Sequence, residues 1–353
     1  MREFMRVLAI VMLAVAAVVA NDGPFLAVPA GGIQFKKTDV VSMDKEDLFI
    51  SEDKIRVSYV FRNATDKDFT TEVAFPLPIY SLDEFEGMKP NYANFTVKVD
   101  GKDVAFRTIE RAVLCKKQEK EWAAPARGQW EAEKDVTAIV EKHKVPIGAP
   151  EAVWEGLSKL SPDAVNELVA AGAVSKEDDL ILPEWRVQTA YVWEQTFPAN
   201  AELRVSHEYE PQRGYFQEWH LEPFVEEVYA GKMQLDDVPK FGSEAFNAKT
   251  GDFLKRYEID EGVQKWAEKQ RNAKKRFSFV VVDYILSTAA YWKGPIKEFT
   301  LTIEKPDTPE PVAISTAISG LKKVDDRKFS VTYKDFVPEK DLSVLFIHAY
   351  EEF

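Results

Sequence analysis

Residues 54–78 constrain the fold more than any other stretch, because apolar and polar side chains alternate there in two successive runs. The inward set of the first run is Ile55, Val57, Tyr59 and Phe61, and the same period of two returns at positions 69, 71, 73 and 75. This period is typical of a strand with one buried face. The polar residues 63–68 favour a turn, and two prolines at 76 and 78 end the second run. We therefore predict a β-hairpin.

Further strands follow from the same pattern. Residues 95–99 and 104–108 alternate on either side of Asp100-Gly101, and Asp-Gly between alternating runs is a strong hairpin signal. The other predicted strands lie at 185–193, 203–209, 277–286, 299–303, 312–318, 329–333 and 342–348. Many short strands separated by turns indicate a mainly β (α+β) fold. We expect an antiparallel β-sandwich with a helical insertion, plus a second, smaller β-rich domain.

Helical signals are confined to two parts of the chain. Residues 161–172 begin with a Ser cap followed by Pro and end at Gly, and residues 150–157 form a shorter candidate helix. An amphipathic helix is predicted at 260–275, where it ends in a basic tail. The predicted division is therefore a signal peptide (1–20), a sandwich domain (21–113 and 183–216), a helical insertion (114–182), a linker with a helix (217–275) and a C-terminal β-rich domain (276–353).

The first 20 residues have the pattern of a secretory signal. Arg2 and Arg6 precede an apolar run of 13 residues at 7–19, and small residues lead up to Ala20. A membrane-spanning helix needs roughly 20 apolar residues, so the run is too short for an anchor. We expect cleavage after Ala20, a periplasmic or secreted protein, and no transmembrane segment in the mature chain.

The net negative charge of the chain limits the kinds of molecule that it can bind. The chain has a net charge of −13, which becomes −14 without residues 1–20 because these contain two arginines and one glutamate. So acidic a surface repels nucleic acid, and no nucleic-acid partner is expected. Cys115 is the single cysteine, so no internal disulfide can form. Its thiol is either a small buried group or free to react.

No motif in the sequence fixes a reaction. His207 and His220 lie among glutamates, but adjacent residues of a strand point to opposite faces, so a structural histidine is favoured over a metal ligand. Cys115 as a nucleophile with His143 as its base is a further hypothesis, but two lone residues are a weak signal of such a site. The aspartate pairs at 178, 236 and 325 lack calcium-loop spacing and suit solvated turns. No catalytic residue, metal or cofactor is predicted.

Aromatic residues supply the candidate ligand surface. Trp185, Tyr191 and Trp193 share a strand face and are expected to be core, whereas Tyr215 and Trp219 follow Gly214 in a segment where burial is less assured. Aromatic faces suit the apolar faces of sugars. The predicted ligand-binding residues are His207, Tyr209, Tyr215, Phe216, Trp219 and His220.

Several segments resemble a known family. They are residues 47–51 (DLFIS), 57–63 (VSYVFRN), 73–78 (VAFPLP), 193–198 (WEQTFP), 207–211 (HEYEP) and 292–296 (WKGPI). Together they are similar to the bacterial domain of unknown function family DUF4424. A weaker similarity of the first β region is to vault and inter-alpha-trypsin type domains. The first resemblance implies an exported bacterial protein and carries over no catalytic residue, and the second implies a binding or scaffold sandwich.

These observations predict a non-enzymatic periplasmic binding or scaffold protein whose partner is a protein or a carbohydrate. The alternative is a hydrolase that acts on an envelope polymer or polysaccharide, with Glu218 and Glu222 as acid and base.

Overall fold

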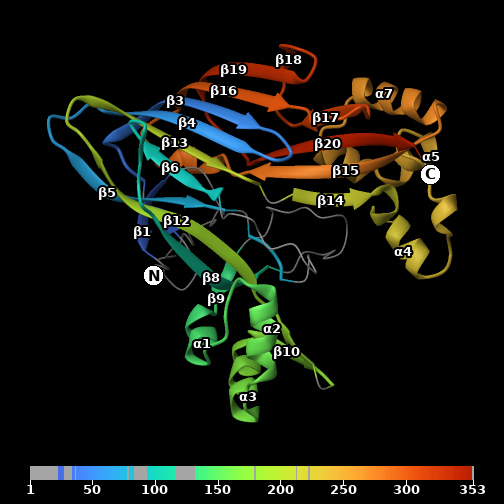
Figure 1. Cartoon of the computed structure of the whole chain (residues 1–353), viewed down its shortest axis with the longest axis horizontal. Coiled ribbons are helices and arrows are strands. Elements are labelled where there is room, and N and C mark those ends of the chain that lie inside the picture. Colours follow the sequence, from blue (N-terminus) through green and yellow to red (C-terminus); the bar gives the residue numbers. More distant parts are fainter. Residues whose placement is uncertain are drawn as a thin grey trace, which may run out of the picture.

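The computed structural model describes residues 23–27, 34–35, 37–77, 79–82, 94–116, 132–178, 180–211, 213–221 and 223–351. The predicted signal peptide and its cleavage point lie outside these ranges. The described chain forms three main β-sheets, with helices gathered at two separate places on them (Figure 1). The predicted β-rich fold is confirmed.

The largest sheet has eight strands in the order β18-β19-β16-β3-β4-β13-β6-β7. Its members are β3 (Val41–Ile50), β4 (Ile55–Asn63), β6 (Thr96–Val99), β7 (Lys102–Asp103), β13 (Ala201–Tyr209), β16 (Ile296–Glu304), β18 (Lys322–Lys323) and β19 (Lys328–Phe336). β3 and β16 are parallel, and the other neighbours are antiparallel. The predicted turn between β6 and β7 is confirmed, with φ of 48° at Asp100 and 77° at Gly101. The second strand predicted at 104–108 is wrong, because β7 ends at Asp103 and residues 107 and 108 begin the strand Arg107–Cys115 of another sheet.

A second sheet has the order β2-β1-β5-β12-β8-β9. Its strands are β1 (Gly23–Ala27), β2 (Gln34–Phe35), β5 (Phe69–Pro76), β8 (Arg107–Cys115), β9 (Ala132–Asp135) and β12 (Arg186–Phe197). The predicted hairpin of the two alternating runs is wrong, because β4 pairs with β3 and β13 whereas β5 pairs with β1 and β12. Residues 64–68 instead carry the chain between the two sheets. The Asn63 side chain fixes this corner by donating to the carbonyls of Lys67 (2.8 Å) and Phe197 (3.0 Å).

A third sheet has the order β14-β15-β20-β17, with β14 (Arg213–Gln217), β15 (Lys275–Tyr284), β17 (Val312–Thr316) and β20 (Leu342–Glu351). One face of it, including Val282 and Phe346, packs into the cluster that the two larger sheets share. The other face, including Phe279 and Ile347, packs against the second group of helices. These are α4 (Phe224–Tyr229), α5 (Glu244–Lys249), α6 (Gly251–Arg256) and α7 (Glu261–Asn272), with the short 3₁₀ turns η2 (Glu218–His220) and η3 (Leu235–Asp237).

The predicted helix at 260–275 is confirmed as α7. Its N-cap is Asp260, whose carboxylate accepts from the backbone N–H of Val263 at 2.8 Å. The proposed boundary at residue 276 remains a prediction. Strands from both sides of it share the eight-stranded sheet, since β16 pairs with β3.

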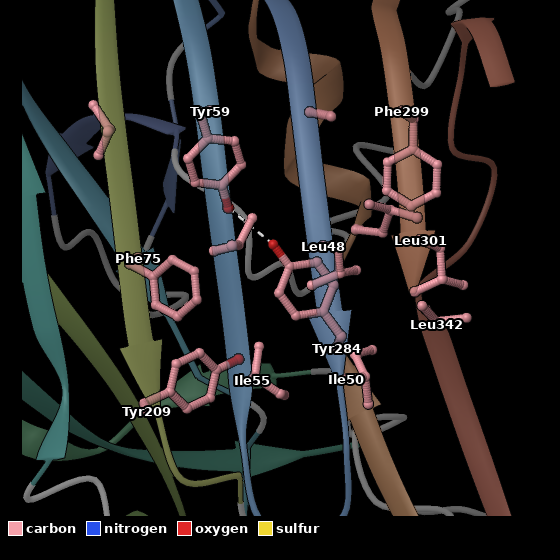
Figure 2. Packing of buried hydrophobic residues seen from close by; sticks show 14 of the residues in the cluster. Leu48, Ile50, Ile55, Tyr59, Phe75, Tyr209, Tyr284, Phe299, Leu301 and Leu342 are labelled. Carbon is pink, nitrogen blue, oxygen red and sulfur yellow. Dashed lines mark hydrogen bonds between the residues drawn. The ribbon is translucent and has the colours of Figure 1, made fainter. Parts of the chain in front are cut away.

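The main core lies where the sheets face one another. Leu48 of β3 and Phe299 of β16 belong to the same buried cluster as Tyr284 of the four-stranded sheet (Figure 2). The hydroxyls of Tyr59 and Tyr284 are 2.8 Å apart, and Tyr284 also donates to the fully buried Glu46 at 3.2 Å. Buried polar atoms are stable when they are hydrogen-bonded, so these contacts keep the core polar groups satisfied.

The helices predicted at 150–157 and 161–172 are confirmed as α2 (Pro150–Ser158) and α3 (Pro162–Ala171). The structure adds α1 (Thr137–Lys142) before them and the hairpin β10 (Val174–Glu177) and β11 (Leu180–Pro183) after them. Ser161 caps α3 by accepting from Ala164 N–H, and Gly172 ends it with φ of 76°. This group projects from the six-stranded sheet, away from α4 to α7 (Figure 1). None of the described helices is long and apolar enough to cross a membrane.

Candidate functional site

A pocket of about 240 Å³ lies at one end of the four-stranded sheet. Three elements distant in sequence meet there: the segment in which β14 passes into η2, the start of β15 and the end of β20. The turn η3 supplies a further wall. Its polar and aromatic lining consists of Gln217, Glu218, Trp219, Asp236, Arg276, Phe277, Tyr350 and Glu351. The pocket therefore combines an indole with several ionisable groups.

Glu218 is the buried ionisable group of this lining, with an exposed fraction of 5%. Its carboxylate accepts from Phe241 N–H at 3.1 Å, and its other oxygen lies 4.0 Å from Nη1 of Arg276. Burial raises the pKa of Glu218 to about 7, against the opposing effects of these partners, of Lys240 and of Phe277 N–H. This carboxyl group therefore changes charge close to neutral pH.

Trp219 is held in place by its neighbours. Its Nε1–H donates to Oε1 of Gln217 at 3.2 Å, and its ring centroid is 3.8 Å from that of His220. Nδ1 of His220 in turn accepts from Gln217 N–H at 3.0 Å, and burial lowers the pKa of this histidine. Tyr229 meets the indole edge-on at 6.2 Å. The short turn thus presents the indole as a fixed wall of the pocket.

The six predicted ligand-binding residues do not gather at one place. His207 and Tyr209 belong to the main core, and Phe216 is buried in the cluster under the helices, stacked on Phe279 at 5.0 Å. Tyr215 lies on the exposed face of β14. Trp219 lines the pocket and His220 packs against it, so these two belong to one site.

His207 has the surroundings of a core residue. It is 2% exposed, and its ring lies 4.9 Å from Phe75 and 5.3 Å from Phe95. The aromatic residues predicted as core, Trp185, Tyr191 and Trp193, are all buried. Within the described ranges no group of three His, Cys, Asp or Glu side chains is placed to hold a metal ion.

The hypothetical nucleophile Cys115 is unsuited to that role. Burial raises the pKa of its thiol to about 11, so the reactive thiolate is scarce at neutral pH. His143 contacts Glu167 instead, with 3.0 Å between Nε2 and the carboxylate. Of the hypothetical acid and base pair, Glu218 lines the pocket, whereas Glu222 lies outside the described residues.

Sequence reasoning missed most of the pocket. Arg276 directly follows the basic tail of the helix predicted at 260–275, and Asp236 belongs to an aspartate pair that is expected in a solvated turn. Tyr350 and Glu351 belong to a strand that was noted only for its apolar pattern. Each of these residues is ordinary in its local context, and only the pairing of β15 with β20 brings Arg276 beside Tyr350.

Comparison with protein families gives a match over nearly the whole chain. The family model described as "Domain of unknown function (DUF4424)" matches residues 20–345. None of the curated proteins matches the chain. The weaker resemblance to vault and inter-alpha-trypsin type domains remains a prediction.

Solved structures are distantly similar, and two of them serve as examples. A candidate nutrient binding protein from Legionella pneumophila has 16% sequence identity and a TM-score of 0.43, with 93% of this chain and 71% of that chain covered. An M1 zinc metallopeptidase from Deinococcus radiodurans has 9% identity and a TM-score of 0.26, with 90% of this chain and 45% of that chain covered.

Proposed function

The chain belongs to the DUF4424 family, and we propose that it is an exported binding protein that holds a sugar-sized polar ligand in the pocket beside Trp219. The observation that carries this proposal is the combination of an oriented indole and a buried carboxyl group on the walls of one pocket. Ligand pockets typically join apolar or aromatic walls to a few placed polar groups.

The volume of the pocket favours a small ligand. Pockets for drug-sized molecules measure roughly 300–1,000 Å³, and this one measures about 240 Å³. A single sugar ring has an apolar face for the indole and hydroxyl groups for hydrogen bonds. Glu218, Arg276 and Tyr350 supply acceptors and donors on the same lining.

A hydrolase would use the same carboxyl group, because a pKa near 7 suits a general acid. An enzyme that cuts inside a polymer must seat linked sugar units on both sides of the bond that breaks. A pocket sized for one ring does not offer that length, and binding is therefore the better supported function.

The Trp219→Ala variant is expected to bind its ligand about 10-fold more weakly, because the indole supplies the apolar wall. The measurement is isothermal titration of the protein with a panel of neutral hexoses and hexosamines. Trp154→Ala is the matched control, since Trp154 is a partly exposed tryptophan on α2, in the separate helical group. Its affinity should equal that of the unaltered protein.

Two outcomes would overturn the proposed binding site. One is that no sugar of the panel binds the unaltered protein. The other is that the two tryptophan variants lose affinity equally, which would place the ligand elsewhere or reveal a general loss of folding.

Export is proposed from residues 1–20, with Arg2, Arg6 and the apolar run ahead of Ala20 as its support. Expression of the full chain in a Gram-negative bacterium should give a periplasmic product. N-terminal sequencing should show Asn21 as its first residue. A cytoplasmic product that still begins at Met1 would contradict export.

A further inference from the structure

The lining of the pocket has more acidic than basic side chains. Its lining has three carboxyl groups, on Glu218, Asp236 and Glu351, and one guanidinium, on Arg276. They come from different elements, since Asp236 lies on η3 and Glu351 ends β20. Asp236 and Glu351 are exposed, whereas Glu218 is buried. A ligand that enters this pocket therefore meets an excess of negative charge.

Two positive groups near the pocket, Arg276 and Lys240, both act on Glu218. The Arg276 guanidinium is 4.0 Å from its carboxylate, and both Arg276 and Lys240 oppose the rise of its pKa. When Glu218 is ionised, its charge offsets that of Arg276 and leaves Asp236 and Glu351. When Glu218 is protonated, these two carboxylates still outnumber the one guanidinium of the lining. These two carboxylates favour a cation on the ligand.

The aromatic wall favours the same charge. The face of an indole carries negative electrostatic potential and attracts ammonium groups. Trp219 lines the pocket, and its ring is positioned by contacts with Gln217 and His220. The acidic and aromatic walls are therefore complementary to one chemical group.

We propose that the pocket selects an amino sugar, a hexose-sized ring with a free protonated amine. This inference rests on the proposed function, because it names the ligand class of the same site. The sugar ring packs on the indole of Trp219, and its ammonium group faces the carboxylates of Asp236 and Glu351. An acidic sugar, which would be drawn to Arg276, is disfavoured by those two carboxylates.

The test compares sugars that differ in one group. Glucosamine, galactosamine and mannosamine are titrated against the matched neutral hexoses at pH 7 and low ionic strength, where screening is weak. We expect at least one amino sugar to bind about 10-fold more tightly than its hexose. The N-acetylated form, whose amine has no charge, should bind like the neutral hexose or more weakly.

Variants test whether the preference for an amino sugar over its neutral hexose arises from the carboxylates of the pocket. The double variant Asp236→Asn with Glu351→Gln should lose most of the 10-fold preference while it still binds the neutral sugar. Asp237→Asn is the matched control, because Asp237 is the exposed neighbour of Asp236 and does not line the pocket. It should keep the preference.

The possible failures are distinguishable. Equal affinity for amino and neutral sugars, with both lost in Trp219→Ala, would overturn the amino-sugar inference and leave the binding function standing. Tighter binding of glucuronate than of glucosamine would also overturn it, in favour of recognition by Arg276. Absence of binding by every sugar would overturn both the inference and the proposed function.

Discussion

Replacement of Trp292 by alanine is expected to lower the free energy of unfolding by about 3–5 kcal/mol. The indole is 1% exposed and lies between two sheets. Its ring centroid is 4.6 Å from that of Phe61 on β4 and 5.6 Å from that of Phe197 on β12. Because both partners belong to ordered strands, the surroundings cannot collapse fully into the space that alanine leaves.

Urea unfolding followed by far-ultraviolet circular dichroism measures this loss. Trp154→Ala is again the matched control, because the Trp154 side chain is 37% exposed and its removal should cost less than about 1 kcal/mol. Equal losses in the two variants would show that Trp292 does not join the sheets in the way that its contacts indicate.

The second large effect is a dependence of stability on pH that originates at Glu218. The pKa of this carboxyl is raised from 4.5 to about 7 in the folded protein. Between these values the folded state keeps a proton that the unfolded state releases, so stability falls as the pH rises. The contribution is complete below pH 4.5 and is lost once the pH passes about 7. A difference of about 2.5 pKa units corresponds to a loss of about 3 kcal/mol.

The Glu218→Gln variant isolates this effect, because glutamine has a similar shape and does not titrate. The quantity to follow is the difference in unfolding free energy between the unaltered protein and the variant, measured from pH 4.5 to about pH 8. As the pH rises over this range, we expect the unaltered protein to lose about 3 kcal/mol of unfolding free energy relative to the variant. A difference that stays constant over this range would mean that Glu218 titrates at its ordinary pKa.

The local elements were largely predictable because their signals are local. The period of two at Ile55 to Phe61 arises from one buried strand face, and the Ser161 cap with Gly172 marks the two ends of a helix. The Asp100-Gly101 turn is set by the backbone conformation that these residues tolerate.

Strand neighbours were less predictable, as the wrong hairpin at residues 54–78 shows. The alternation of apolar and polar residues predicts that Phe61 and Phe75 face a core, and both side chains do. The alternation does not predict that β4 pairs with β13 and β5 with β12. The same faces would also be buried if β4 and β5 formed a hairpin. The corner at Asn63 depends on a contact with Phe197, which is far away in the sequence.

The candidate site divides in the same way. Trp219 and His220 were predicted because aromatic and titratable residues are frequent after Gly214. His207 and Tyr209 were included for the same reason, but they are core residues. Arg276 and Glu351 have no local signal of function. They reach the pocket because β15 and β20 pair along their whole length.

The sequence by itself determined the β-rich class of the fold, three of the helices, the net negative charge and the family, because composition, periodicity and capping act over a few residues. Only the tertiary structure decided which strands share a sheet, how Trp292 joins two of them, and that Glu218, Trp219, Asp236, Arg276 and Glu351 line one pocket. These features depend on contacts between segments that are distant in the sequence, and such contacts form only when the sheets pack together.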